Sequence, residues 1–472
     1  MDPEKDGRVS EQDDGLDQQE QEQGSDQPAE QEQQGTPVMT CRGSFSLLDG
    51  DGAAAGGGEA TLELWEEYFV LLPGDGSVLT WTYREILKII TGDYRVTLAT
   101  VSGEKVLLYG LGYNFEDFLR HFFRLRGEMI VKDMLMHEKV SKAGLQGEYR
   151  YVDEKGATLQ SGPCEPRIYE TALVIIPQAE DPIRIPFSDI EEVTAEDYAL
   201  ALTIWDNAKV IFSMMGSHLD PLKKALTDAM NRLNLKTEAT LRELFPAVES
   251  IYLRKAAAIL RDGKAAACGF IEAISPHLWR GLEQKIELSP VKESYDFLKA
   301  KAQQDKLCIG VKKGLFGDLS GLYFWFLIPI YSSDPERPGN AVAMEAFSTG
   351  ASGGQATYFF RLRGRRSYRR GGDLAGLHRE ADTLLKTINR GMLTINFRRE
   401  PIYLSDEKLR EQRYLKYLYA VNKLPALQDL RARFIGRISH TSPEQWEKDV
   451  TSLLRFNVGT EDDAAVWNKH QD

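Results

Sequence analysis

An internal repeat constrains the fold of the first half of the chain more than any other feature. When the sequence is shifted by 104 residues, residues 43–130 align with residues 147–234 without a gap. Turn residues and strand residues are identical in both copies: Gly43/Gly147, Asp49/Asp153, Gly52/Gly156, Gly58/Gly162, Glu66/Glu170, Val70/Val174, Pro73/Pro177, Ile86/Ile190, Asp93/Asp197, Tyr94/Tyr198, Leu98/Leu202, Lys105/Lys209, Val106/Val210 and Gly112/Gly216. The alignment predicts a duplication, and therefore two modules of one fold in tandem.

Each copy has the pattern of several strands closed by one amphipathic helix. In the first copy we expect strands at 44–48, 62–72, 94–101 and 105–109, a further strand that leads into a short turn within 78–86, and a helix that begins near Asn114. In the second copy we expect strands at 148–152, 166–176, 198–205 and 209–212, a further strand that leads into a short turn within 182–190, and a helix that begins near Ser217. The glycine-rich segment Gly50–Gly58 lacks the spacing and the lysine of a phosphate-binding loop, so we expect a flexible hairpin loop there.

One stretch of the second copy suggests a known fold. Residues 183–193 read IRIPFSDIEEV and precede a hairpin and a C-terminal amphipathic helix. This order resembles the pleckstrin-homology-like (PH-like) fold, including the GRAM and bacterial PH-type domains. The resemblance covers residues 43–234. It implies a scaffold that binds lipids, peptides or proteins, and it brings no catalytic residue with it.

The second half of the chain has a different pattern. Residues 237–303 are expected to form a helical linker region, and residues 304–457 a C-terminal α+β domain. In that domain we expect strands at 307–311, 322–331, 341–347 and 357–362, and helices at 373–389, 406–435 and 443–454. The predicted fold class is α+β, with PH-like modules at 39–143 and 144–236.

Charge is concentrated at the two ends of the chain. Residues 1–38 hold twelve acidic and two basic side chains, and residues 458–472 hold four acidic and one basic. These ends account for the net charge of −13, so residues 39–457 are neutral overall and have no global field that attracts nucleic acid or an anionic membrane. We expect residues 1–38 to be a disordered, glutamine-rich tail and residues 458–472 to be a second acidic tail.

The expected cellular location and the expected lack of cofactors are based on sequence patterns that are missing. The N-terminus has no signal-peptide pattern, and the longest apolar stretch, 321–331, has about half the ~20 residues that a membrane span needs. The four cysteines are far apart, and no pair has zinc-ligand spacing. We therefore expect a cytoplasmic protein with reduced thiols, no transmembrane segment, no metal and no cofactor.

An arginine cluster is the sharpest local signal. Six arginines lie within ten residues, with one tyrosine between them: Arg361, Arg363, Arg365, Arg366, Arg369, Arg370 and Tyr368. Guanidinium groups bind phosphate in a bidentate manner and stack on rings, so this segment is a candidate anion-binding or partner-binding site. Its partner would be nucleic acid, an anionic lipid or an acidic protein segment. The alternative is a solvated strand end whose arginines pair with local carboxylates or with the acidic tail.

The sequence contains no catalytic motif that we recognise, neither a GxSxG elbow nor HExxH. We therefore expect a non-catalytic binding, scaffold or regulatory protein whose tandem modules bind proteins, including a second copy of the chain. Two alternatives remain open at this point. One is binding of nucleic acid or an anionic membrane through Arg361–Arg370, and the other is an enzyme with an unfamiliar site within residues 304–457.

Overall fold

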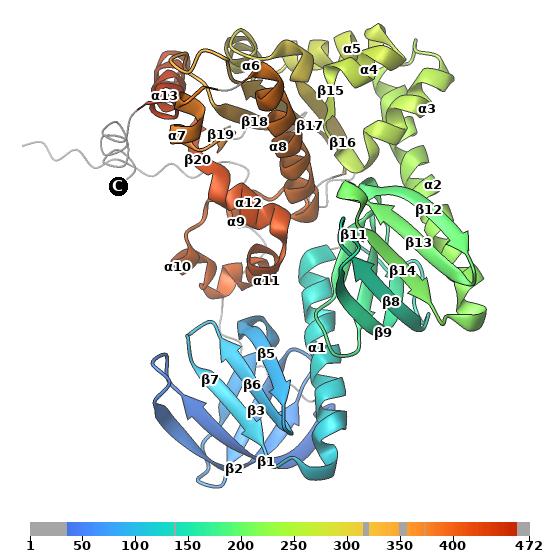
Figure 1. Cartoon of the computed structure of the whole chain (residues 1–472), viewed down its shortest axis with the longest axis vertical. Coiled ribbons are helices and arrows are strands. Elements are labelled where there is room, and N and C mark those ends of the chain that lie inside the picture. Colours follow the sequence, from blue (N-terminus) through green and yellow to red (C-terminus); the bar gives the residue numbers. More distant parts are fainter. Residues whose placement is uncertain (1–34, 136–137, 315–320, 349–355, 372, 460–472) are drawn as a thin grey trace, which may run out of the picture. The chain divides into compact units, whose positions relative to one another are not determined.

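The computed structural model describes residues 35–135, 138–314, 321–348, 356–371 and 373–459. The predicted tails therefore lie almost wholly outside the described residues. The described residues are 42% helical and 32% strand, which confirms the α+β class (Figure 1). It divides into two compact units, one built from residues 35–236 and 390–431 and the other from residues 237–389 and 432–459.

The first module is one curled antiparallel sheet of seven strands in the order β4-β3-β2-β1-β7-β6-β5, followed by a helix. Its elements are β1 (Met39–Leu48), β2 (Ala54–Leu64), β3 (Tyr68–Pro73), β4 (Leu79–Thr82), β5 (Ile86–Gly92), β6 (Arg95–Thr100), β7 (Lys105–Tyr109) and α1 (Phe115–Leu135). Alternate strand residues such as Leu62, Val96 and Leu108 point into the curl, where Phe118 and Phe122 of α1 cover them. The apolar face of α1 thus completes the core.

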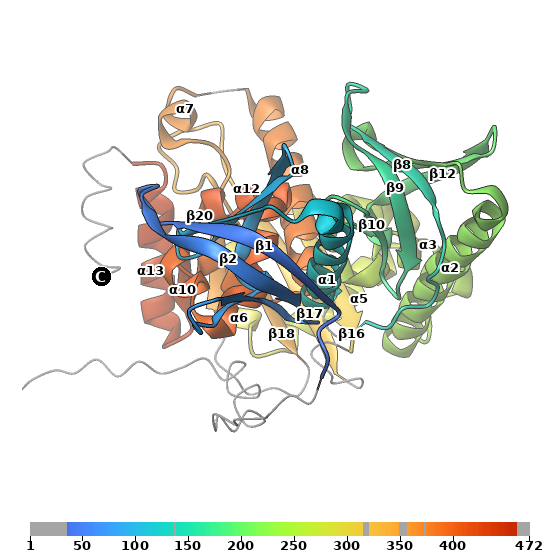
Figure 2. The same cartoon turned by 90° about the horizontal axis from the view of Figure 1, so that it is seen from below.

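The second module repeats these elements at the same spacing of 104 residues. Its elements are β8 (Gly147–Val152), β9 (Thr158–Ile168), β10 (Ala172–Pro177), β11 (Ile183–Pro186), β12 (Ile190–Glu196), β13 (Ala199–Ile204), β14 (Lys209–Ser213) and α2 (Leu219–Leu244). The strand order, β11-β10-β9-β8-β14-β13-β12, also matches the first sheet. Figure 2 shows this sheet as a curl with α2 alongside. The tandem arrangement that the repeat predicts is therefore present in the structure.

Most of the identical pairs in the repeat have a local structural reason. Gly52 and Gly156 adopt φ of +85° and +83° in the turns that follow β1 and β8. Asp49 and Asp153 stabilise the same two turns, because the Oδ1 atom of each accepts two backbone N–H bonds within the turn. Left-handed turn positions favour glycine, so these residues are retained in both copies for the turn itself.

Several details of the predicted strands are wrong, and β5 and β12 were not predicted as strands at all. The glycine-rich segment 50–58 is a short turn followed by the first half of β2, where Gly56 and Gly57 pair with Leu47 and Ser46. A side chain at Gly57 would place its Cβ 2.7 Å from the Phe45 carbonyl oxygen, so glycine permits close strand pairing here. In addition, the single strand predicted at 62–72 is the end of β2, a turn and β3, and the second copy breaks in the same way.

Helix α1 also contacts the second module. Val131 packs with Val174 and Ile176 on the outer face of β10. Arg167 of β9 donates two hydrogen bonds, of 2.7 and 2.8 Å, to the Glu128 carboxylate of α1. Burial of this apolar and charged surface fastens both modules to one helix.

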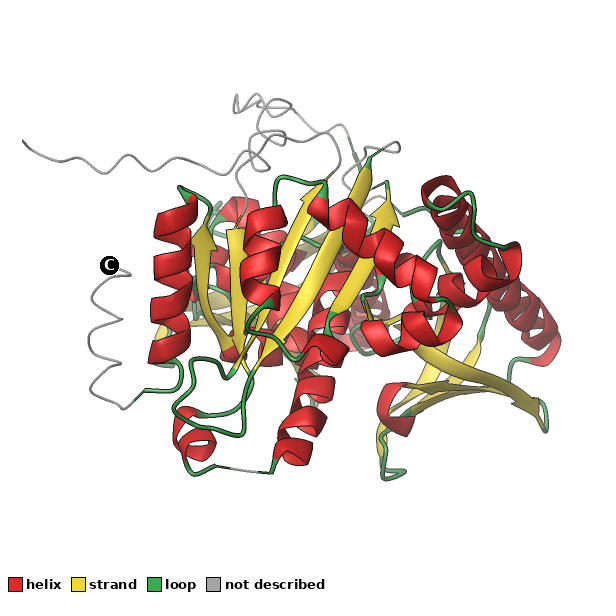
Figure 3. Ribbon diagram, turned by 90° about the horizontal axis from the view of Figure 1, so that it is seen from above, coloured by secondary structure: helices red, strands yellow, loops and turns green. Residues whose placement is uncertain are grey.

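The other unit is a six-stranded antiparallel sheet with helices on both faces (Figure 3). Its strands are β15 (Ala266–Ala267), β16 (Cys308–Lys313), β17 (Leu322–Ile330), β18 (Ala341–Ser348), β19 (Ala356–Arg361) and β20 (Phe434–Ser439), in chain order. One face forms a single core with α3 (Ser250–Ile259), α5 (Pro276–Glu287), α6 (Lys292–Lys299) and α13 (Pro443–Phe456). Helix α8 (Leu374–Thr394) lies over the other face (Figure 1).

The helix predicted at 406–435 is also wrong. The segment holds α10 (Asp406–Leu409), α11 (Leu415–Lys423), α12 (Pro425–Arg433) and the start of β20. Pro425 explains the main break, because proline disfavours helical backbone at the preceding residue, and Leu424 is extended with ψ of 111°. In the described part of the chain, no helix combines the length and the apolar character needed to cross a membrane.

Candidate functional site

The predicted arginine segment lies at the end of β19 and in the short helix α7 (Arg365–Arg369). Its side chains do not point in one direction toward solvent. Arg361 is partly buried and donates to the Asn457 side chain at 2.7 Å. Arg363 makes two hydrogen bonds, of 2.7 and 2.6 Å, to the Glu380 carboxylate of α8. These two arginines therefore help to hold the domain together.

Of the remaining members of the segment, some also contact local groups and others are exposed to solvent. The Arg365 guanidinium lies 4.4 Å from the centre of the Phe456 ring, and Arg369 pairs with Glu336 at 3.2 Å. Tyr368 is buried, and its hydroxyl is hydrogen-bonded to the backbone of Ser332. Arg366 and Arg370 are exposed. Most arginines of the segment thus contact local groups, as the second interpretation of the sequence expected. A role of the segment in binding an anion stays a prediction.

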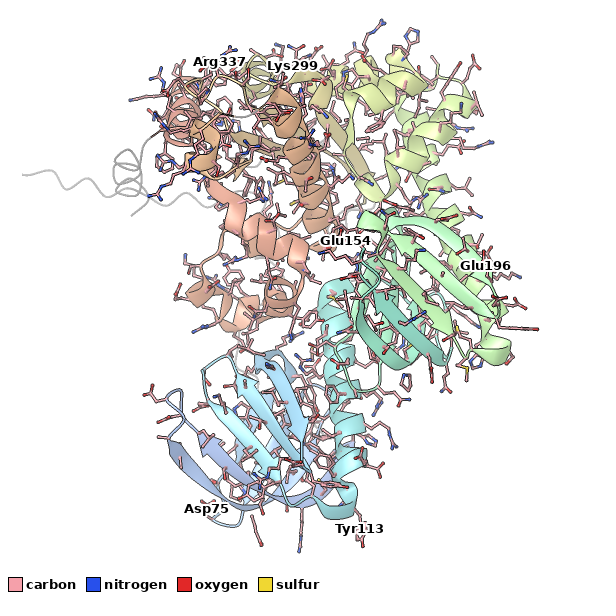
Figure 4. All side chains as sticks on the ribbon, viewed as in Figure 1. Asp75, Tyr113, Glu154, Glu196, Lys299 and Arg337 are labelled. Carbon is pink, nitrogen blue, oxygen red and sulfur yellow. The ribbon has the colours of Figure 1, made fainter. Side chains whose placement is uncertain are left out.

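A second candidate site comes from the hairpins that follow β5 and β12. Each hairpin has a two-residue turn, Asp93-Tyr94 in one module and Asp197-Tyr198 in the other. Both residues of each turn are left-handed, and Tyr94 and Tyr198 have φ of +55° and +62°. Figure 4 marks Glu196, the last residue of β12, at the outer edge of the second sheet. We call Tyr94 and Tyr198 the tip tyrosines.

The tip tyrosines are costly in the folded chain. They are 74% and 92% exposed, so they contribute little to either core. A bulky residue in the left-handed region costs roughly 1–2 kcal/mol, and glycine or asparagine is the usual residue at this turn position. Asp49, Gly52 and their equivalents are explained by their turns, whereas the two-residue turns at 93–94 and 197–198 would form more easily with glycine or asparagine than with tyrosine.

Further apolar side chains lie beside the tips. In the second module, Tyr198 directly precedes β13 and Met214 directly follows β14, and these strands pair through Leu200 and Phe212 at this end. Met214 is 79% exposed and left-handed, with φ of +53°, at the position where the first module has Gly110. In the first module the Tyr94 ring contacts Phe115, and Tyr113 is fully exposed nearby in sequence (Figure 4). Each module thus presents exposed apolar side chains at the same end.

A third arrangement was not predicted from the sequence. Glu345 lies in the middle of β18, and its side chain is 0% exposed on the face that packs against α5, α6 and α13. The Glu345 carboxylate lies 2.9 Å from His440 Nε2 and accepts a 2.8 Å hydrogen bond from the Thr357 hydroxyl. The Ser294 hydroxyl is 3.4 Å away. We call these residues the Glu345 cluster.

Trp446 of α13 fixes the orientation of the cluster. Its indole N–H donates to the Thr357 hydroxyl at 3.2 Å, and its ring stacks on the His440 ring at a centroid distance of 5.2 Å. The only sequence signal is one carboxylate within the apolar run AVAMEAF at 341–347. Sequence reasoning missed the cluster because His440 is 95 positions further along the chain, and spacing does not show which side chains converge.

Neither a metal site nor a family match points to a function for this chain. Among the described residues, no three His, Cys, Asp or Glu side chains are grouped so that they could hold a metal ion. Comparison of the sequence with protein-family models and with curated proteins gives no significant match. The functional argument therefore depends on the geometry of this chain alone.

Proposed function

We propose that this chain is a non-catalytic binding protein whose tandem modules hold a protein partner through the tip tyrosines. The observation that carries the proposal is that both copies place the same residue, Tyr94 or Tyr198, exposed and left-handed at the same turn. Most other identical pairs of the repeat support turns or cores. A residue that is costly for the fold and present in both copies is best explained by a role outside the fold.

The chemistry of the tips favours a protein partner. Tyrosine supplies a large rigid surface with one polar group, and it is enriched among the residues that dominate binding energy at protein interfaces. No lysine or arginine flanks Tyr198 within three residues, and only Arg95 flanks Tyr94, so the tips lack the charge that phosphate binding requires. We expect the binding to take place in the cytoplasm.

The test is a double replacement, Tyr94→Gly with Tyr198→Gly. Glycine relieves the left-handed strain, so Tyr198→Gly should raise the free energy of unfolding by about 0.5–1 kcal/mol. Tyr94→Gly should be nearly neutral because it also loses the Phe115 contact. Protein partners of the tagged full chain are then purified from its own cells and quantified by mass spectrometry. We expect a stoichiometric partner that the double variant retains about 30-fold less well.

The matched control is Val78→Ala. Val78 is also exposed and apolar, but its equivalent in the second module is Pro182, so the two copies do not share it. The control should keep the partner. A double variant that is folded and retains the same partners as the wild type would refute the proposal. The same comparison by sedimentation tests whether the partner is a second copy of the chain.

The first alternative makes a different prediction. If nucleic acid or an anionic membrane is the partner, binding depends on the arginine segment, in which Arg361 and Arg363 already contact Asn457 and Glu380. Binding would then be lost with nuclease or high salt, and with Arg366→Ala and Arg370→Ala, but kept by the tyrosine variant. The second alternative, an enzyme with a site in residues 304–457, predicts a substrate at the Glu345 cluster.

A further inference from the structure

A surface pocket opens beside the Glu345 cluster. It has a volume of about 170 Å³ and lies between the turn before α6 and the segment that joins β20 to α13. Nine residues line it: Pro290, Glu293, Ser294, His440, Thr441, Ser442, Pro443, Trp446 and Glu447. His440 is 23% exposed, so the cluster is in contact with the pocket. A small molecule that enters the pocket would meet the His440 ring.

The lining is rich in hydrogen-bond acceptors and lacks fixed positive charge. Its ionisable groups are the Glu293 and Glu447 carboxylates, both exposed, and the His440 imidazole; no lysine or arginine lines the pocket. Any positive charge on His440 is compensated by Glu345 directly beneath it. Such a lining disfavours an anionic ligand and favours a cationic one.

The buried Glu345 orients the acceptor. A hydrophobic residue at this place in the core would be at least as stabilising as a buried ion pair, so stability alone does not explain a carboxylate. An ionised carboxylate accepts the proton on Nε2, and a neutral imidazole held in this way has its lone pair on Nδ1. The hydrogen bonds that described residues make to this ring all reach Nε2, so Nδ1 is left for a ligand.

We propose that this pocket binds the protonated amino group of a small organic amine. The ammonium group has three donors, which His440 Nδ1 and the rim carboxylates of Glu293 and Glu447 accept. The carbon chain lies against Pro290 and Pro443. The pocket volume equals that of about six water molecules, so the ligand is the size of a short alkylamine. This inference does not depend on the role of the tip tyrosines.

The experiment is saturation-transfer NMR on the full chain, which measures the transfer of magnetisation from the protein to a bound probe. Three probes of similar shape are compared: n-butylamine, n-butanol and n-butyrate. We expect clear transfer to butylammonium, weak transfer to butanol and none to butyrate. The imidazole carbon-bound proton signal of His440, identified among seven histidines by its absence in His440→Gln, should shift as butylammonium is added.

Variants on the rim locate the site. Glu293→Gln and Glu447→Gln should each weaken butylammonium binding about threefold, which is the effect of one exposed charge pair. Glu444→Gln is the matched control, because Glu444 is exposed on the same helix but does not line the pocket. All three residues are exposed, so the fold should not change. Equal transfer to butyrate, an unchanged His440 signal, or equal effects of Glu447→Gln and Glu444→Gln would each overturn the proposal.

Discussion

At the scale of single residues, Glu345 is the clearest example of a buried side chain whose presence core packing does not explain. The neighbouring inward residues of β18 are Ala343 and Phe347, and the core around them is apolar. A buried carboxylate is tolerated only when donors compensate the loss of water. Here Thr357, Ser294 and His440 supply those donors. The energy of the site therefore depends on the whole cluster.

The first prediction for stability follows from this dependence. His440→Leu removes a hydrogen-bond donor from a carboxylate that stays buried, so we expect the free energy of unfolding to fall by about 2 kcal/mol. Glu345→Leu with His440→Leu removes both members and should recover most of the loss. The free energy of unfolding of both variants is measured in urea, with the unfolding monitored by hydrogen exchange of residues 341–361. If the double variant is as unstable as His440→Leu, the two residues are not coupled.

At the scale of elements, α1 is the helix on which the first unit depends. Side chains from Phe115 to Met129 cover the core of the first sheet, and Val131 packs on β10. Arg126 lies at the junction, where it forms an ion pair with Asp181 and donates to the Ile86 carbonyl oxygen at 3.1 Å. Asp181 belongs to the second module and Ile86 to the first, so one side chain links both.

Replacement of Arg126 tests this link. Arg126→Met keeps the apolar stem but leaves the Ile86 carbonyl and Asp181 without their guanidinium partner, so we expect a loss of about 3 kcal/mol in the unfolding of this unit. Arg120→Met is the control on the same helix. Arg120 pairs with Asp117, but both side chains are more than half exposed, so the loss should stay below about 0.5 kcal/mol. Similar losses for both variants in urea unfolding would contradict the role of Arg126.

The elements also show how far the sequence predicts this fold. The repeat predicts the tandem sheets because turn glycines and strand patterns are local signals. The predicted strand at 62–72 is wrong because the turn at 65–67 contains Trp65-Glu66-Glu67 and no glycine or proline. The strand through Gly56 and Gly57 was missed because pairing with β1 overrides the weak strand propensity of glycine. Among the candidate site residues, the arginine segment could be recognised from local composition. Its ion pairs with Glu336 and Glu380 could not be predicted from the sequence.

At the scale of the molecule, the four cysteines report on separate parts of the chain. Cys41 lies in the core of the first module and Cys164 in that of the second, whereas Cys268 and Cys308 belong to the other unit. Burial raises the pKa of Cys41 to about 11 and contributes most to raising the pKa of Cys164, Cys268 and Cys308 to about 12. The thiolate is the reactive form, so all four thiols should be nearly inert at neutral pH.

Alkylation with iodoacetamide in increasing urea, quantified for each cysteine peptide, therefore follows the opening of each part. We expect Cys41 and Cys164 to become reactive in one transition, because α1 and Arg126 join their modules, and Cys268 and Cys308 to react together in a second transition. In Arg126→Met the first transition should split, with Cys41 and Cys164 reacting at different urea concentrations. Unchanged, simultaneous labelling of Cys41 and Cys164 in that variant would mean that the apolar contacts of Val131 with β10 are sufficient to couple the modules.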